Sequence, residues 1–140
     1  MGKKVKVVLD TNVWISIFMK KTLGREFSRL FKQGKIEVFI SEKILREISR
    51  VLTYPKITRL LEDVGISMKE VLKHIVDNST LVKPVVKLRV IKEDVADNII
   101  LECAYQDKVD FIVSGDKHLL KLKKFKGIRI IAPRELLDIF

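Results

Sequence analysis

The chain has 140 residues, 47% of them hydrophobic, and carries 28 Lys and Arg against 18 Asp and Glu, for a net charge of +10. This length suffices for one domain with a sizeable core, and no apolar run approaches the ~20 residues that a membrane-spanning helix needs. The basic excess predicts a polyanionic partner, nucleic acid ahead of a membrane surface. A basic surface can also serve solubility alone.

The amino end has no apolar signal core, so we expect a cytoplasmic protein. Cys103 is the only cysteine, which excludes an internal disulfide, and its apolar neighbours indicate a buried side chain. One cysteine and two distant histidines, His74 and His118, do not make the ligand set of a structural zinc site.

The first half of the chain predicts two strands, each followed by helical segments. In chain order these are a strand at 5–9, helices at 13–18 and 24–33, a strand at 36–40 and a helix from 41 to 52. The unbroken aliphatic run of the first strand is typical of a buried parallel strand. Gly34 is the expected stop of the second helix, and Ser41 the expected N-cap of the third.

The second half continues the alternation. It predicts helices at 56–64 and 68–78, an extended or irregular stretch at 81–90, a helix at 96–106, strands at 111–113 and 128–131, and a last helix beginning at Pro133. Ser67 and Glu70 form a capping box before the second of these helices. With no internal repeat or linker, we expect one domain over residues 1–140. Its alternating elements predict a parallel α/β sheet with helices on both faces, whose ligands bind at the carboxyl ends of the strands.

Acidic residues follow two of the predicted strands. Asp10 comes directly after the first strand, and Asp116 closes the segment after the third. In a parallel sheet both carboxylates leave the sheet at the same edge. An Asp after a strand commonly does no more than cap a turn, but two of them at one edge favour a site.

Two helices add further acids. Asp97 is in line with the apolar stripe of its helix and therefore faces the interior, whereas Asp94 fits the N-cap of that helix. Asp97 could also be a first-turn acid favoured by the helix dipole, although this does not explain its inward direction. Glu47 borders the apolar stripe of the 41–52 helix, where a solvated glutamate is the common alternative.

If Asp10, Glu47, Asp97 and Asp116 converge, they cannot all stay ionised without a cation among them. Ligands that are all oxygen suit the hard ions Mg²⁺ and Mn²⁺. Such an ion orients and acidifies a water molecule and holds a phosphate oxygen. The four acids in a basic protein thus predict a metal-dependent nuclease.

The chain resembles the PIN-domain family. The matching segments are 8–13 (VLDTNV), 41–47 (SEKILRE), 51–56 (VLTYPK), 94–98 (DVADN), 113–116 (VSGD) and 132–137 (APRELL). In their order and spacing they cover nearly the whole chain. The resemblance is strongest to prokaryotic, VapC-like toxin components of toxin–antitoxin systems.

This resemblance implies a three-layer α/β/α sandwich around a mainly parallel sheet and Mg²⁺- or Mn²⁺-dependent cleavage of single-stranded RNA. It maps Asp10, Glu47, Asp97 and Asp116 onto catalytic, metal-binding acids and Asp94 onto an additional metal-site acid. It maps Thr11, Asn12 and Ser114 onto polar positions that support the site. An antitoxin protein and a homodimer are the further partners that it suggests.

The segment from Asp116 to Arg129 contains six basic residues and one acid in fourteen positions. It is the best candidate for contact with the RNA backbone beside the site, although a solvated helix face would have the same composition. The expected RNA-binding side chains are those of Lys117, Lys121, Lys123, Lys124 and Lys126.

Two other functions compete with cleavage. The first is a catalytically weak or inactive PIN-like module that binds RNA or a protein, and the presence of an acid at every motif argues against it. The second is a phospho-accepting signalling domain. That domain needs a pair of acids on the first strand and a phospho-accepting Asp that ends a middle strand. Here Asp10 has no acidic neighbour, and the second strand closes at Ser41 without an Asp.

Overall fold

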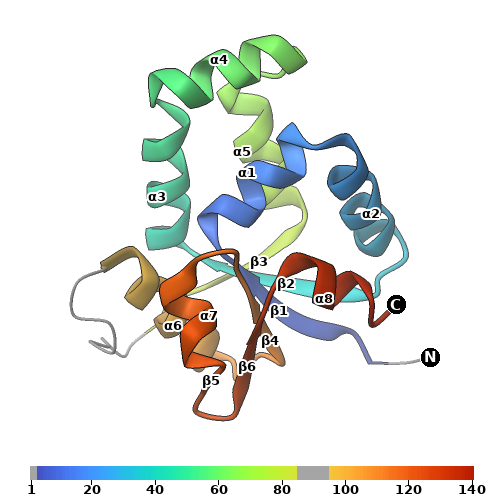
Figure 1. The fold of residues 1–140 in the computed structure, drawn as a ribbon, viewed down its shortest axis with the longest axis vertical. Coiled ribbons are helices and arrows are strands. Elements are labelled where there is room, and N and C mark those ends of the chain that lie inside the picture. Colours follow the sequence, from blue (N-terminus) through green and yellow to red (C-terminus); the bar gives the residue numbers. More distant parts are fainter. Residues whose placement is uncertain (1–2, 85–94) are drawn as a thin grey trace.

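A computed structural model describes residues 3–84 and 95–140, in which the chain folds around one mainly parallel sheet flanked by helices (Figure 1). The six strands of the described residues run in the order β3-β2-β1-β4-β6-β5, and only β5 is antiparallel to its neighbour. They are β1 (Val5–Leu9), β2 (Ile36–Ser41), β3 (Ser79–Val82), β4 (Phe111–Val113), β5 (Lys124–Phe125) and β6 (Ile128–Ile131). The α/β fold with a parallel sheet, predicted from the alternation of elements, is confirmed.

The helices of the described residues connect these strands. They are α1 (Thr11–Met19), α2 (Lys21–Lys32), α3 (Glu42–Leu52), α4 (Pro55–Val64), α5 (Met68–Asp77), α6 (Val95–Gln106), α7 (Lys117–Leu122) and α8 (Pro133–Leu137). Figure 1 shows α3, α4 and α5 rising from the sheet as a helical extension, with α4 at its far end. No helix in the described parts of the chain combines the length and the apolar character needed to cross a bilayer.

Local signals account for most helix ends. The Ser41 hydroxyl accepts a hydrogen bond from the Ile44 amide at 3.2 Å, which caps α3 as predicted. The capping box between Ser67 and Glu70 is also present. Gly34, with φ of +63°, ends α2 in the left-handed conformation that glycine adopts most readily.

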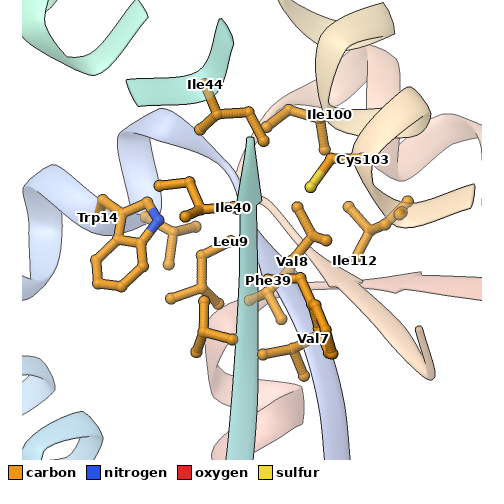
Figure 2. Close-up of a cluster of buried hydrophobic side chains, with 14 of the residues drawn as sticks. Val7, Val8, Leu9, Trp14, Phe39, Ile40, Ile44, Ile100, Cys103 and Ile112 are labelled. Atoms are coloured by element: carbon orange, nitrogen blue, oxygen red, sulfur yellow. The ribbon is translucent and has the colours of Figure 1, made fainter. Parts of the chain in front are cut away.

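The core lies on both faces of β1, whose residues Val7, Val8 and Leu9 have no exposed surface. Figure 2 shows Leu9 near Trp14 of α1, while Val8 faces the side of Cys103 on α6. Because both faces are covered, the strand needs apolar residues at consecutive positions rather than at alternate ones. Cys103 is buried, as its neighbours predicted, and burial raises the pKa of its thiol to about 12.

Two strands differ from the sequence prediction. The stretch predicted as extended or irregular from residue 81 begins within a strand, β3, which starts two residues earlier and pairs with β2 in parallel from Ser79 to Val82. The two-residue strand β5 lies inside the basic segment and pairs with β6. The remainder of the predicted irregular stretch, residues 85–90, lies outside the described residues.

Gly24 provides a test of the packing between α1 and α2. A Cβ atom at this position would overlap the backbone carbonyl oxygen of Ile17 on α1, and backbone cannot move aside as a flexible side chain can. We expect Gly24→Ala to lower the free energy of unfolding by about 1–3 kcal/mol, as overpacked sites do. Urea denaturation measures this change, with Ser28→Ala on the same helix as the control. Equal stability of the two variants would contradict the close approach.

Candidate metal centre

Ser114 joins two acids at the carboxyl edge of the sheet. Its hydroxyl donates a hydrogen bond to Asp10 Oδ2 at 2.6 Å and accepts one from the Asp116 backbone amide at 2.9 Å. Ser114 is fully buried and Asp10 is 7% exposed. The two residues follow the adjacent strands β4 and β1, as expected for neighbouring strands of a parallel sheet.

The start of α7 orients Asp116. The carboxylate caps this helix, because its Oδ1 accepts hydrogen bonds from the amides of His118 at 2.7 Å and Leu119 at 3.4 Å. Its side chain is 29% exposed. These bonds hold the carboxylate at the sheet edge and leave part of it open to solvent.

Asp97, Asp116 and His118 form a group that could hold a metal ion, since each offers one ligand atom and these atoms lie within 4.8 Å of one another. Asp97 comes from the first turn of α6 and is 5% exposed, so it faces inward as its place in the apolar stripe predicted. His118 Nδ1 is 3.6 Å from Asp116 Oδ1. The structure therefore brings together residues that are distant in sequence.

Sequence reasoning missed His118, which it considered only as a zinc ligand without a partner. The available signal was its position two residues after Asp116, because that spacing places Asp116 at the N-cap and His118 in the first turn of a helix that begins at the sheet edge.

Burial dominates the electrostatics of Asp10. It raises the pKa of the carboxyl above its ordinary value; the Ser114 hydrogen bond lowers the pKa, and the Asp116 carboxylate raises it further. The nearby backbone amides of Thr11 and Asn12 lower it. The net shift is upward, so the ionised form of Asp10 is costly unless a cation lies near it.

The donor set fits a divalent ion. Carboxylate oxygens suit Mg²⁺ and Mn²⁺, and an imidazole nitrogen is a ligand for transition metals, so His118 widens the choice beyond Mg²⁺. Asp97, Asp116 and His118 provide the ligand atoms, and Asp10 lies beside them through Ser114.

Glu47 lies on α3 and its side chain is 19% exposed. Both of its carboxylate oxygens accept hydrogen bonds from Arg50 Nη2, at 2.8 and 2.7 Å. It does not belong to the metal-binding group found among the described residues. The structure therefore gives Glu47 a different partner from the one that the hypothesis of four converging acids required.

The remaining predicted site residues are Thr11, Asn12 and Asp94. Thr11 is buried and Asn12 exposed at the start of α1, where their amides rather than their side chains affect Asp10. Asp94 lies outside the described residues.

The five predicted RNA-binding lysines are all exposed, but their environments differ. Lys117 and Lys121 lie on α7, and Lys124 is in β5. Lys126 lies over the rings of Tyr105 and Phe125, with its Nζ 5.7 and 5.9 Å from their centroids. Lys123 and Lys126 both have positive φ. Lys117 and Lys121 are thus the two cations carried by the helix that Asp116 caps.

Comparison with known proteins identifies the family of this chain. The chain matches the PIN domain over residues 6–118, a span that contains every residue of the centre described above, and it belongs to that family. The PIN domain is a nuclease fold, and its nucleases typically use divalent metal ions. The chain is also similar to an uncharacterized protein of Methanocaldococcus jannaschii, with 29% identity over 147 aligned positions that cover 98% of this chain and 92% of the relative.

The raised pKa of Asp10 predicts a stability change that needs no activity assay. Because the pKa in the folded state lies above that of the unfolded chain, ionisation of Asp10 opposes folding; the cost is present above the folded pKa and absent below the unfolded one. We therefore expect Asp10→Asn to raise the melting temperature of the metal-free protein by a few degrees at neutral pH and to have less effect in acid.

Thermal melting in EDTA at several pH values measures this effect. Asp63→Asn, which removes the same charge from an exposed position on α4, is the control. A lower melting temperature for Asp10→Asn than for the control would show that the ionised carboxylate stabilises the fold.

Proposed function

We propose that the protein is an endoribonuclease that cleaves single-stranded RNA with Mg²⁺ or Mn²⁺. The observation that carries the proposal is the group formed by Asp97, Asp116 and His118 beside the buried Asp10, at the sheet edge of a PIN domain with a net charge of +10. A negatively charged phosphodiester approaches such acids only when a cation separates them, so the acids and the basic surface have complementary tasks.

In this proposal the chain supplies position and charge. Asp97, Asp116 and His118 would hold the ion, and a bound divalent ion acidifies water and stabilises negative charge on phosphoryl oxygens. Ser114 fixes the side chain of Asp10, and the first amides of α7 fix that of Asp116. Both carboxylates are thus held before the substrate arrives, which lowers the cost of reorganisation during reaction.

Glu47 and Asp94 enter the proposal as metal-site acids on the family resemblance alone. For Glu47 to bind the ion, its carboxylate has to share or release its hydrogen bonds to Arg50. Because Arg50 is exposed and the pair joins neighbouring turns of one helix, this exchange costs little.

The biological role is part of the same proposal. The resemblance to VapC-like proteins supports a toxin component that acts in the cytoplasm, is inhibited by an antitoxin protein and forms a homodimer. The basic surface and the acidic centre support RNA as the target.

A specific observation favours one alternative, a PIN-like module that binds RNA without cutting it. Glu47 is occupied by Arg50, so the acid set of a cleaving enzyme is incomplete in this arrangement. The cleavage experiment separates the two functions, because only the nuclease requires both a metal ion and intact Asp116.

We expect the wild-type protein to cut labelled single-stranded RNA in Mg²⁺ or Mn²⁺ and not in EDTA. Asp116→Asn should reduce the rate by about 100-fold or more, the order seen when a preorganised electrostatic group is lost. Asn caps a helix as well as Asp does, so α7 should remain folded in this variant.

Asp63→Asn should cut at the wild-type rate. Gel analysis of the products, together with the melting temperature of each variant, checks these expectations. Cleavage by Asp116→Asn at the wild-type rate would exclude the proposed centre, and RNA that is bound but never cut would favour the binding module.

The basic segment predicts a salt dependence. We assume that Lys117 and Lys121 each contact one phosphate. The double variant Lys117→Gln with Lys121→Gln should then make the plot of the logarithm of the RNA association constant against the logarithm of the salt concentration less steep by about 1.4, which is about 0.7 for each contact with a single strand. Binding measured at several KCl concentrations in the Asp10→Asn background gives the slope. Lys56→Gln with Lys69→Gln, on the helical extension, removes the same charge and should leave the slope unchanged; equal slopes for both pairs would contradict contact through α7.

A further inference from the structure

A pocket of about 660 Å³ lies beside the acidic centre. It is bordered by α1, by the start of α2, by the loop after β4 and by the start of α8. The lining residues are Asn12, Val13, Ser16, Lys20, Lys21, Thr22, Leu23, Gly115, Ala132, Pro133 and Arg134. Its volume falls in the range of about 300–1,000 Å³ that is usual for small-molecule sites.

The pocket adjoins the centre through the backbone, although no side chain of the centre lines it. Gly115 lies between Ser114 and Asp116, and Asn12 is two residues beyond Asp10. One border of the pocket is therefore formed by segments that also carry acids of the centre.

The charge of the pocket is opposite to that of the centre. Its lining contains Lys20, Lys21 and Arg134 and no acid. Arg134 is paired with Glu26 at 3.1 Å, whereas neither lysine makes an ion pair within residues 3–84 and 95–140. The two lysines are thus the cations of this pocket that are available to an anionic ligand.

The remaining lining divides into polar and apolar groups. Leu23 and Pro133 offer an apolar surface, with Val13 nearly buried at 2% exposure. Asn12, Ser16 and Thr22 offer hydrogen-bonding groups. A nucleotide needs this combination: cations for the phosphate, an apolar surface for the faces of the base and polar groups for its edges.

Gly115 borders open space. Apart from its two chain neighbours, a Cβ atom at this position would meet no atom within 4 Å, and the backbone there is not in the left-handed region. Neither packing nor backbone conformation requires glycine at this position of the pocket lining.

We propose that this pocket binds the nucleotide next to the scissile phosphate, with its base on the apolar surface and its other phosphate at Lys20 and Lys21. The proposal rests on the proposed function, since it assigns a substrate subsite to the same centre. It makes recognition of a base, and not only of the backbone, a property of this pocket.

A second pocket of about 670 Å³ serves as an internal control. It lies between α1 and α2 on one side and α4 and α5 on the other, shares Lys20 and Lys21 with the first pocket, and includes an acid, Asp63. Because both lysines line both pockets, only the serine substitutions distinguish one pocket from the other. Ser16 lines only the first of these two pockets and Ser28 only the second, and both serines are half-buried on helices. The same substitution at each serine therefore fills one pocket and spares the other.

The test measures binding of a fluorescein-labelled single-stranded RNA hexamer of mixed sequence to Asp10→Asn protein in Mg²⁺, because a phosphodiester approaches the acids only when a cation lies between them. Ser16→Leu should weaken binding by about tenfold, the order expected when one base loses its contact surface. Ser28→Leu should leave binding within about twofold, the spread expected for a residue outside the binding surface. Equal effects of the two substitutions, or none, would overturn the proposal.

Lys20→Gln with Lys21→Gln provides a second variant whose small polar changes spare the fold. It should weaken binding more than the pair Lys56→Gln with Lys69→Gln, which removes the same charge, and equal weakening would also overturn the proposal. Both arms measure binding, so neither needs cleavage. RNA that binds through Ser16 and the two lysines but is not cut by the wild-type protein would therefore reject the nuclease and retain the pocket.

Discussion

The hydrogen bond from Ser114 to Asp10 connects the sheet to the acidic centre. The backbone ladder runs directly into it, since the Asp10 amide donates to Val113 at 3.0 Å and the Ser114 amide donates to Ile131 at 2.9 Å. Two acids are thus positioned by the ends of paired strands rather than by independent loops. A carboxylate as buried as Asp10 would favour its neutral form, and one buried hydroxyl together with neighbouring amides opposes that tendency. Asp10 and Ser114 directly follow the paired strands β1 and β4, so the backbone hydrogen bonds of the sheet hold both residues in place.

Much of this could be predicted from the sequence because the signals are local. The run Val5–Leu9 is apolar at consecutive positions, a pattern that is typical of a strand covered on both faces. Ser41 and the Ser67–Glu70 pair mark helix starts through hydrogen bonds that span only three residues. The inward direction of Asp97 follows from helical periodicity alone. Asp10 and Asp116 are far apart in sequence, so their spacing alone does not predict that they lie close together. The prediction came from the parallel sheet, in which the carboxyl ends of the strands lie at one edge.

The features that escaped prediction depend on tertiary contacts or on competing partners. Strand β3 has a weak pattern, with Thr80 and Leu81 exposed, and it exists because β2 offers a free edge for parallel pairing. Glu47 borders the apolar stripe of α3, but periodicity cannot decide between a metal ion and Arg50 three residues away, which is close enough for a direct ion pair. The pocket beside the centre is assembled from segments up to 122 residues apart, from Asn12 to Arg134, and no local pattern reports such an assembly.

The distribution of charge relates the pocket, the acidic centre and α7 to one another. Along the chain, Asp116 lies between Gly115, which lines the pocket of Lys20 and Lys21, and Lys117, which begins α7. Segments that adjoin basic regions therefore carry the acid. Exposed lysines attract phosphates over roughly a Debye length, about 8–10 Å at moderate salt, whereas buried acids are screened much less by the solvent. In the proposed function, attraction by the lysines together with repulsion by the acids makes binding of a polyanion across the centre depend on whether a cation occupies it. A metal requirement for close approach of an RNA backbone is thus part of that proposal, and it follows from the charges before any bond in the RNA is broken.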